Sequence, residues 1–443
     1  MQNVHLVSLG CARNLVDSEM MLGLLAEDGL SITQAPAEAD IIIVNTCSFI
    51  EPAVNESIDT ILELAKYKKT GPCRYLIVTG CLPERYRENI VQSLPEVDIF
   101  LGTGAFHKII AAIRKQTTRE AGSSQCLLPD PNLRHLQNQT AARVRSFPHM
   151  AYLKVSDGCG KHCTYCMIPK LRGKQKSRPA QDIVSEAQSL ISTGVKELVL
   201  IAQDTTSYGK DLHPAATLNQ LLVNLADISE NIWIRMLYGH PQSIDETMLR
   251  TVAMRPNICS YFDIPIQHAS NRILKRMARD YSKEDLYRLI DQIRSRIPDA
   301  AIRTTVMVGF PGETDADFAQ LMNFIEEIRF DHLGGFVYSD SENISSHRLS
   351  GRVPEAVAQN RYHQMMARQK EISRQSNRRY IGKRYMILVE EALPGTLFKG
   401  RTFFQAPEVD GVTYVRHSRI QTGCFTEIKI TDAREYDLIG EAV

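Results

Sequence analysis

The stretch DGCGKHCTYCMIPKLRG, residues 157–173, decides how the central part of this chain folds. It carries three cysteines in the spacing C-x-x-x-C-x-x-C, namely Cys159, Cys163 and Cys166. The stretch directly follows the apolar run Tyr152–Ser156. It therefore predicts a loop at the carboxyl end of a β-strand, where β/α barrels carry their active sites. Three thiolates can hold three irons of a 4Fe-4S cluster and leave the fourth iron open to a ligand.

A structural zinc site is the alternative interpretation of these cysteines. Zinc in such sites takes four closed ligands, and His162 is the only nearby candidate for the fourth. Because His162 directly precedes Cys163, the two side chains are poorly placed to bind one ion. The spacing and the position at a strand end therefore favour an iron–sulfur cluster.

The region around this loop, residues 149–370, predicts a partial barrel. Apolar runs of strand length alternate there with helical patterns, and six β/α units are fewer than the eight of a complete barrel. The predicted strands are Tyr152–Ser156, Glu197–Ala202, Ile232–Leu237, Tyr261–Ile266, Ile302–Val308 and His332–Tyr338. The helical patterns include Ile183–Thr193, Lys283–Arg294, Ala316–Ile328 and Pro354–Arg379.

The N-terminal region predicts an α/β domain with a parallel sheet and a second cysteine trio. The predicted strands are Val4–Ser8, Ile41–Asn45 and Tyr75–Thr79, with helical patterns at Ser18–Glu27 and Val54–Tyr67. Cys11, Cys47 and Cys81 each fall just past one strand, at the edge where open α/β sheets bind ligands. Because neighbouring strands lie about 4.8 Å apart, the three thiols can meet although they are distant in sequence. Three buried structural cysteines are the alternative.

The C-terminal region predicts a small antiparallel β-barrel or sheet. Its short alternating runs, often separated by Gly or Pro, are Tyr385–Glu390, Thr396–Phe404, Gly411–Val415 and Phe425–Ile430. A polar stretch at residues 122–147, without a clear period, predicts an interdomain linker.

The chain as a whole has 443 residues and a net charge of +1. Such a charge leaves nucleic-acid binding to a local patch. The start MQNVHLVSLG lacks the features of a signal peptide, and no apolar run reaches the roughly 18 residues of a membrane span. The ten cysteines are therefore expected in a reducing cytoplasm, where metal binding or catalysis is commoner than disulfides. Cys73, Cys126, Cys259 and Cys424 have no strand-end placement and are expected to be ordinary thiols.

At CGKHCTYC the sequence resembles the radical S-adenosylmethionine superfamily, and with the N-terminal trio it resembles the methylthiotransferases. It is most similar to the RimO-type branch, which methylthiolates an aspartate of small-subunit ribosomal protein twelve. The motifs are SLGCARNLVDSE (8–19), VNTCSFIEPAVNES (44–57), VTGCL (78–82), IPKLRG (168–173), AQDTTSYG (202–209), FDIPIQHAS (262–270), VGFPGET (308–314) and GRTFFQAPEVDG (400–411). Ala12 and Arg13 depart from the Pro and Lys of that pattern, but they flank the cysteine rather than replace it.

The resemblance implies a methylthiotransferase N-terminal domain (1–121), a linker (122–147), a partial (β/α)6 radical domain (148–375) and a TRAM domain (376–443). It implies two 4Fe-4S clusters, an auxiliary one on Cys11, Cys47 and Cys81 and a radical one on the central trio. S-adenosylmethionine bound at the radical cluster would give a radical that removes a substrate hydrogen. Sulfur held at the auxiliary cluster would then combine with the substrate radical. A second S-adenosylmethionine would supply the methyl group. The electron donor and sulfur source are not identified, and the TRAM region is a candidate RNA contact.

Seven residues are candidate contacts to S-adenosylmethionine because they flank the cysteine loop or lie on predicted barrel strands and the turns after them. They are Tyr165, Met167, Glu197, Gln203, Arg235, Gln267 and Gly309. His268, Pro311 and Gly312 lie beside two of them. Ordinary turn chemistry is the alternative for each.

Five further polar residues have weaker interpretations. Asp17 and Glu19 are predicted to be helix-start residues. Asn45 is a candidate lining of the auxiliary pocket. Glu408 and Asp410 either face a basic ribosomal protein or form a solvated turn.

Two other functions stay open. A transfer-RNA methylthiotransferase would share the chemistry and bind RNA in a salt-sensitive way. The PIQHAS stretch and the near-neutral C-terminal region favour a protein substrate instead. A non-catalytic iron–sulfur or RNA-binding protein would not cleave S-adenosylmethionine, and two complete cysteine trios argue against it.

Overall fold

The structure is a computed structural model that describes residues 2–117, 124–133, 143–417 and 419–443. The chain forms two compact units. The first comprises residues 1–146, 154–161 and 167–182, and the second comprises residues 147–153, 162–166 and 183–443. Within the described ranges no helix is both long and apolar enough to cross a membrane.

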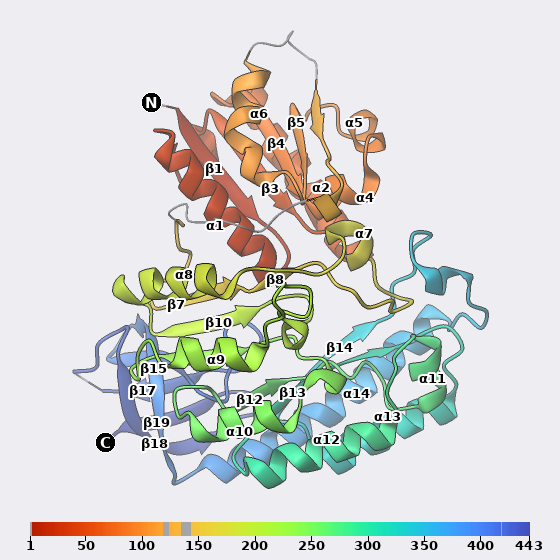
Figure 1. Ribbon diagram of the computed structural model, residues 1–443, viewed down its shortest axis with the longest axis vertical. Coiled ribbons are helices and arrows are strands. Elements are labelled where there is room, and N and C mark those ends of the chain that lie inside the picture. The colour runs from red at the N-terminus through yellow and green to blue at the C-terminus, as the bar shows by residue number, and fades with distance from the viewer. Residues whose placement is uncertain (1, 118–123, 134–142, 418) are drawn as a thin grey trace. The chain divides into compact units, whose positions relative to one another are not determined.

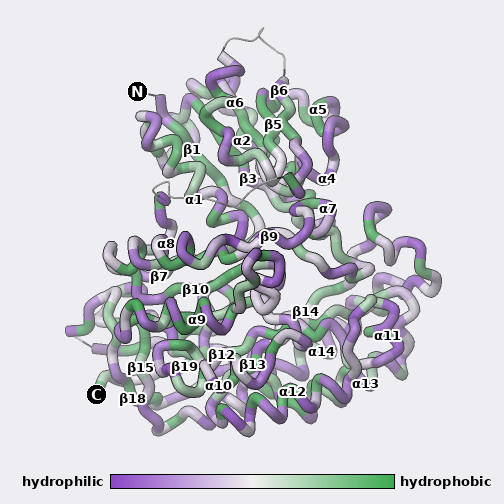
Figure 2. Tube along the Cα trace, in the orientation of Figure 1, coloured by the Kyte–Doolittle hydropathy of each residue, from purple (hydrophilic) through white to green (hydrophobic). Residues whose placement is uncertain are grey.

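The first unit is built on a six-stranded parallel sheet with the order β2-β1-β3-β4-β5-β6 (Figure 1). The strands are β1 (Asn3–Ser8), β2 (Ser31–Ile32), β3 (Ile41–Thr46), β4 (Tyr75–Gly80), β5 (Ile99–Gly102) and β6 (Gln125–Leu127). The three predicted strands are β1, β3 and β4, which are neighbours. The apolar strands of this sheet are green in Figure 2, as expected for strands covered on both faces.

Helices cover this sheet, and side chains of α2 pack on one face together with Ile42 and Val44 of β3. The helices are α1 (Ala12–Glu27), α2 (Glu51–Ala65), α3 (Tyr67–Thr70), α4 (Cys81–Tyr86), α5 (Asn89–Ser93) and α6 (Ile109–Gln116). Helix α7 (Ile168–Arg172) and the antiparallel pair β8 (Ser156–Asp157) and β9 (Lys176–Ser177) complete the unit. The helical patterns at Ser18–Glu27 and Val54–Tyr67 correspond to α1 and α2.

The predicted linker, residues 122–147, contains regular structure. Its beginning forms β6, an edge strand of the sheet. Residues 122, 123 and 134–142 of that prediction lie outside the described residues. The strand was missed because three residues are too few to show an alternating pattern.

The second unit contains all six strands that the sequence predicts for the partial barrel. They are β7 (Met150–Lys154), β10 (Glu197–Ile201), β11 (Trp233–Met236), β12 (Tyr261–Asp263), β13 (Ala301–Val308) and β14 (His332–Val337). They form two three-stranded sheets, β11-β10-β7 and β12-β13-β14. The pairs β10–β11, β12–β13 and β13–β14 are parallel.

Helices alternate with these strands along the chain, as the predicted β/α units require (Figure 1). They are α8 (Ala180–Ser192), α9 (Leu218–Ala226), α10 (Glu246–Met254), α11 (Asn271–Arg276), α12 (Lys283–Arg296), α13 (Asp315–Ile328) and α14 (Glu355–Asn377). Helices α12 and α13 begin with capping boxes at Ser282 and Thr314, which satisfy the first free backbone N–H groups. The four predicted helical patterns correspond to α8, α12, α13 and α14.

A closed five-stranded barrel ends the second unit, with the order β15-β16-β17-β19-β18. Its strands are β15 (Arg384–Leu393), β16 (Leu397–Thr402), β17 (Thr413–Arg416), β18 (Phe425–Ala433) and β19 (Leu438–Ala442). The sequence predicted the first four. Strand β19 closes the barrel, and it pairs with β17 in parallel, whereas the other four pairs are antiparallel as predicted.

Candidate metal centres

The N-terminal cysteine trio lies at one edge of the first unit's sheet. Cys11 follows β1 and caps α1, Cys47 follows β3, and Cys81 is the first residue of α4, directly after β4. The three strands are adjacent and parallel, so their carboxyl ends meet at the same edge. The fold thus brings three distant thiols to one place, as the strand-end pattern predicts.

Two glycines with left-handed backbone make this close approach possible. Gly10 has φ +93, and a Cβ there would lie 2.7 Å from the Cβ of Cys47. Gly80 has φ +95, and a Cβ there would lie 2.4 Å from Asn45 Oδ1. Any other residue at either position would clash and strain the backbone, which explains why glycine precedes Cys11 and Cys81.

The three thiols share one electrostatic environment. Burial would raise the pKa of Cys11, but the charges of Arg13 and Arg172 hold it below its ordinary value. Burial raises the pKa of Cys47 and raises that of Cys81 to about 12, and each of these two thiols also responds to charge on its neighbours in the trio. The trio is therefore close enough for its members to interact.

A buried ion network accompanies this trio. Arg172 in α7 is 3% exposed, and its Nη1 lies 3.2 Å from carboxylate oxygens of both Asp17 and Asp157. Its Nη2 donates to Asn14 Oδ1 at 2.5 Å, and Lys154 also pairs with Asp17. Two cations and two carboxylates balance one another, as buried charges require.

This network corrects the prediction for Asp17 and Glu19 as helix-start residues. Helix α1 begins at Ala12 and has no acidic residue in its first turn. Glu19 is buried; it pairs with Arg143 and accepts a hydrogen bond from the Ser146 N–H at 2.8 Å. Both carboxylates lie on the buried side of α1, where only a paired charge is stable.

Asn45, the candidate lining residue, joins β3 to α1. It is 2% exposed, and its Nδ2 donates to the Asn14 carbonyl at 2.8 Å and to Ser18 Oγ at 2.9 Å. Asn14 in turn donates to the Thr46 carbonyl at 2.9 Å. These bonds fix the strand end that carries Cys47.

The central trio lies on the loop after β7. In the first unit, the Cys159 N–H donates to the Gly173 carbonyl at 3.1 Å, and the Cys159 sulfur accepts from the Lys161 N–H at 3.4 Å. Met167, a predicted cofactor contact, is 2% exposed and precedes α7. Both residues are therefore held by packing within this unit.

The rest of the loop, Cys163 to Cys166, is held by the second unit. The Thr164 N–H donates to the Met277 carbonyl at 3.1 Å, and the Thr164 carbonyl accepts from the Ser346 N–H at 2.9 Å. The Tyr165 ring packs edge-on against Phe310, with ring centroids 6.5 Å apart. Cys163 and Cys166 are half-buried, so a bound group could reach both thiols.

A closed single-ion site is not formed by either trio. Among the residues that the structure describes, no three His, Cys, Asp or Glu side chains are grouped to hold one metal ion. None of the ten cysteines, all of which lie within the described ranges, forms a disulfide.

Two predicted cofactor contacts, Gln203 and Gln267, lie just past the carboxyl ends of barrel strands. Gln203 follows β10. Gln267 has φ +66, its N–H donates to the Thr305 carbonyl at 2.9 Å, and its carbonyl accepts from the Met307 N–H at 2.8 Å. A left-handed non-glycine residue is strained, and such strain concentrates at functional sites.

Gly309, the third strand-end residue, follows β13 in the turn that leads to α13. It has φ +77, and a Cβ there would lie 2.5 Å from the Cβ of Ala358, so close packing against α14 requires the glycine. Gly309 and Pro311 also border a cavity of about 230 Å³. The other lining residues are Val337, Tyr338, Asp340, Arg352, Val353, Glu355 and Ala358.

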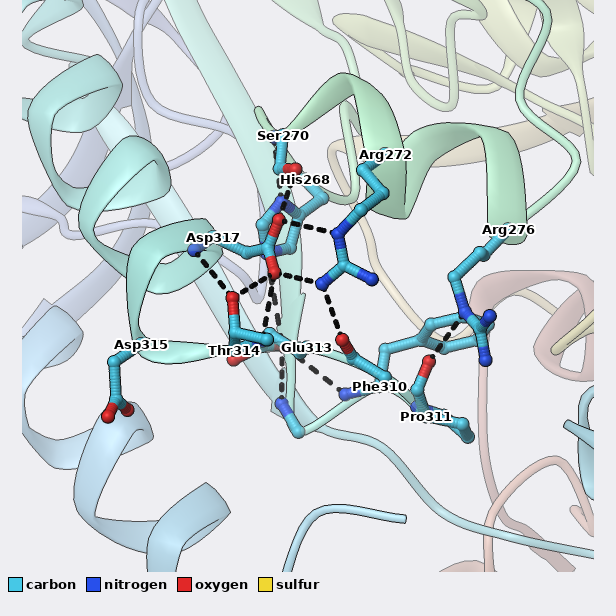
Figure 3. A network of polar contacts seen from close by, with 12 residues as sticks. His268, Ser270, Arg272, Arg276, Phe310, Pro311, Glu313, Thr314, Asp315 and Asp317 are labelled. Atoms are coloured by element: carbon cyan, nitrogen blue, oxygen red, sulfur yellow. Dashed lines mark hydrogen bonds and ion pairs between the residues drawn. The ribbon is translucent and has the colours of Figure 1, made fainter. Parts of the chain in front are cut away.

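The buried carboxylate of Glu313 holds this turn through backbone hydrogen bonds (Figure 3). Glu313 Oε2 accepts from the N–H groups of Gly309 at 2.8 Å and Phe310 at 3.3 Å, and Oε1 accepts from Arg361 at 2.8 Å. His268 Nε2 lies 3.8 Å from Glu313 Oε2, and His268 Nδ1 accepts from the Ser270 N–H at 2.9 Å. Burial lowers the pKa of His268 to about 3, so its imidazole is neutral.

The structure does not bring Glu197 and Arg235 to these strand ends, which corrects their prediction as cofactor contacts. Both are fully buried. Arg235 Nε donates to Glu197 Oε1 at 2.6 Å, and Arg401 Nη2 donates to Glu197 Oε2 at 2.5 Å. Arg235 also donates to the Phe403 carbonyl at 2.6 Å. These contacts join strands β10 and β11 to the closed barrel, and they pair the charges of both residues.

Glu408 and Asp410 both contact the same junction, but they differ in exposure. Glu408 Oε2 accepts from the Tyr152 hydroxyl at 2.6 Å. The Asp410 side chain is 1% exposed, and its Oδ2 accepts from the Tyr261 hydroxyl at 2.6 Å. Glu408 is exposed, as a solvated turn requires, whereas the buried Asp410 side chain is not solvated.

Three charged residues were missed: Arg172 and Arg279, which lie near the cysteines, and Glu313, which holds the turn at Gly309. Arg172 lies in IPKLRG and Glu313 in VGFPGET, but neither motif by itself indicates a partner for the charged side chain. Arg279, whose Nη1 lies 3.4 Å from Cys163 Sγ, lies in none of the quoted motifs. Its partner is 116 positions away, a pairing that spacing alone does not reveal.

Comparison with known families divides the chain into three matches. Residues 3–102 match the uncharacterized protein family UPF0004, residues 153–325 the radical SAM superfamily, and residues 381–443 the TRAM domain. Each match falls within one of the three domains that the resemblance implies.

Two full-length relatives carry the same name. The chain is 51% identical over 440 residues to ribosomal protein uS12 methylthiotransferase RimO of Desulfosudis oleivorans, covering 99% of both chains. It is 46% identical to the protein of the same name from Clostridioides difficile, covering 100% of this chain and 99% of that one.

A solved structure shares the fold at lower identity. It is the radical S-adenosylmethionine methyltransferase TsrM of Kitasatospora setae with cobalamin and a [4Fe-4S] cluster bound. The TM-score is 0.58 at 14% identity, covering 78% of this chain and 77% of that chain.

Proposed function

Because this chain belongs to the RimO family of radical S-adenosylmethionine methylthiotransferases, we propose that it adds a methylthio group to the β-carbon of an aspartate in ribosomal protein uS12. The observation that carries the proposal is the full-length similarity to enzymes of that name, at 51% identity over 99% of both chains. A transfer-RNA substrate has no comparable support. Residues 376–443 are a secondary candidate for RNA contact, and the proposed site of action is the cytoplasm.

The radical S-adenosylmethionine family implies a 4Fe-4S cluster and S-adenosylmethionine, and we assign the cluster to Cys159, Cys163 and Cys166. Three soft thiols on one loop, with an arginine N–H on the Cys163 sulfur, suit an iron–sulfur cluster. When bound, the cluster and S-adenosylmethionine supply radical chemistry able to replace hydrogen on an unactivated carbon. The protein's part is to hold the cysteine loop, through Thr164, against the end of α11.

A second 4Fe-4S cluster is proposed on Cys11, Cys47 and Cys81. The donor chemistry fits, because three thiols at one sheet edge share a buried and balanced electrostatic environment. Gly10 and Asn45 fix the strand ends, and the Arg172 network holds α7 beside α1. An electron donor and a sulfur source must come from outside the chain.

For S-adenosylmethionine we propose contacts from Tyr165, Met167, Gln203, Gln267 and Gly309. Tyr165 and Met167 flank the last cysteine of the loop, and the other three follow barrel strands at the end that carries active sites. Support comes from the strained backbone at Gln267 and from the cavity that Gly309 borders. Glu197 and Arg235 are left out because of their buried pairing.

The direct test is mass spectrometry of uS12 from cells with and without this gene. A methylthio group in place of hydrogen adds about 46 Da to one aspartate. Loss of that gain on deletion is the expected result. An unchanged uS12, with loss of a methylthio group from a transfer-RNA adenosine, would keep the chemistry and overturn the substrate.

A further inference from the structure

Arg279 is placed on the cluster loop by its own turn of backbone. Helix α11 ends at Arg276, and Ala278 then adopts φ +54, a strained conformation for a residue other than glycine. The Arg279 N–H donates to the Leu274 carbonyl at 2.9 Å, which closes the helix end. The strained turn therefore fixes the direction in which the arginine leaves the helix.

The guanidinium is held at three points, and one of them is a sulfur. Its Nε donates to the Tyr281 hydroxyl at 2.6 Å and its Nη2 to the Pro265 carbonyl at 2.8 Å. Its Nη1 donates to Cys163 Sγ at 3.4 Å. Tyr281 is itself fixed, because its hydroxyl donates to the Ile266 carbonyl at 2.9 Å. The geometry at the sulfur is thus determined by the fold.

Charge pairing distinguishes Arg279 from three other buried arginines of the molecule. Arg172, Arg235 and Arg401 all pair with carboxylates. In the part of the chain that the structure describes, Arg279 forms no ion pair with a carboxylate. Its oxygen partners are a hydroxyl and a carbonyl, both neutral. The positive charge is therefore not neutralised by a partner other than the Cys163 sulfur.

We propose that Arg279 is a positioning residue that raises the reduction potential of the cluster assigned to Cys163 by donating a charge-assisted hydrogen bond to the Cys163 sulfur. Hydrogen bonds to the sulfurs and local charge are among the factors that set iron–sulfur potentials. A cation beside the cluster stabilises the form that has gained an electron. Arg279 would thus make the one-electron reduction that precedes radical formation easier for an external donor.

The test is an EPR-monitored redox titration of the reconstituted full-length protein with dithionite and mediators, without S-adenosylmethionine. Cys11, Cys47 and Cys81 are replaced by alanine throughout, so that one cluster is observed. Arg279→Gln removes the charge and the fork of donors, and Arg279→Lys keeps the charge but loses the fork. Lys275→Gln, at an exposed position of α11, is the matched control for losing one positive charge.

The reduction equilibrium constant of Arg279→Gln is expected to fall on the order of tenfold, because the reduced cluster carries one more negative charge and gains more from the charged donor than the oxidised cluster does. For one electron a tenfold change is about 59 mV, here toward more negative potential. Arg279→Lys should shift less, and Lys275→Gln should not shift. If Arg279→Gln does not assemble a cluster, the potentials of Arg279→Lys and of Tyr281→Phe, which removes the hydroxyl that holds the guanidinium, test the proposal instead. Unchanged potentials in both of these variants would overturn it.

This inference rests on the proposed assignment of the cluster, and the two fail differently. A parent protein that binds no iron or does not cleave S-adenosylmethionine overturns the assignment. A parent with a normal cluster, and an Arg279→Gln variant with the same potential, overturns only the role of Arg279. A variant that loses affinity for S-adenosylmethionine at unchanged potential would make Arg279 a cofactor ligand instead.

Discussion

The two cysteine trios are built in opposite ways. Cys11, Cys47 and Cys81 come from the ends of three strands, and they meet only because the parallel sheet is folded. Cys159, Cys163 and Cys166 lie on one short loop, so the chain itself keeps them near one another. Cluster binding at a site assembled by tertiary structure should depend on the stability of its unit. Cluster binding at a site formed by one loop should depend mainly on the cysteines of that loop.

Each trio has a nearby arginine, and the two arginines differ in their partners. Arg172 is neutralised by Asp17 and Asp157 and joins α7 to α1. Arg279 has neutral oxygen partners and donates directly to the Cys163 sulfur. The first arginine is expected to act mainly through folding, and the second mainly through charge.

The largest effect is expected from removing the central trio. Replacing Cys159, Cys163 and Cys166 by alanine should abolish S-adenosylmethionine cleavage and methylthiolation completely, while about four irons stay bound at the other trio. Iron analysis and chromatography of the cleavage products measure both. Residual cleavage would show that these cysteines do not hold the cluster.

A large loss of stability is expected at the buried junction within the second unit. Glu197→Ala leaves two buried guanidinium groups without their shared partner and should cost about 3–5 kcal/mol. Glu246→Ala, which removes exposed ion pairs to Arg250 and Arg296, should cost about 0–1 kcal/mol. Denaturant unfolding measures both. Weaker S-adenosylmethionine binding by Glu197→Ala at normal stability would restore its cofactor role.

A sharper test of the tertiary site uses two glycines of the first unit. Gly10→Ala and Gly29→Ala both put a side chain on left-handed backbone, so each should cost about 1–2 kcal/mol. Only Gly10→Ala adds a clash, since a Cβ at Gly29 meets nothing within 4 Å. Iron content should fall in Gly10→Ala and stay normal in Gly29→Ala. Equal iron in both would mean that the strand-end packing does not shape the site.

The smallest expected effect is a change in the pH dependence of the unfolding free energy, caused by the buried His268 beside Glu313. The folded pKa of His268 is about 3, below the ordinary value of 6.5, so only the unfolded chain gains this proton as pH falls. This residue's contribution is therefore present above pH 6.5 and decreases below it, by up to about 1.4 kcal/mol per pH unit. Wild type should lose more unfolding free energy than His268→Gln between pH 7 and pH 5.5. Parallel losses in denaturant titrations would contradict the burial of a neutral imidazole.

Prediction from the sequence succeeded where a pattern repeats along the chain. The apolar strand runs and the cysteines just past them depend on local order, so nine predicted strands of the two sheet regions are present. It failed for buried charges such as Asp17, Glu197 and Asp410, which look like surface residues until their partners are known. The partners of Asp17 lie 137 and 155 positions away, those of Glu197 lie 38 and 204 away, and Tyr261 lies 149 positions from Asp410. The edge strand β6 was missed because its three residues are too few to show a period.

The most direct test of the account is the mirror variant, in which Cys11, Cys47 and Cys81 are all replaced by alanine. The account predicts loss of about half of the bound iron, continued cleavage of S-adenosylmethionine, and no methylthio transfer to uS12. Iron analysis, product chromatography and mass spectrometry of uS12 on one preparation measure all three. A variant that keeps all of its iron, or that still transfers the methylthio group, would contradict the assignment of a second cluster to the sheet edge.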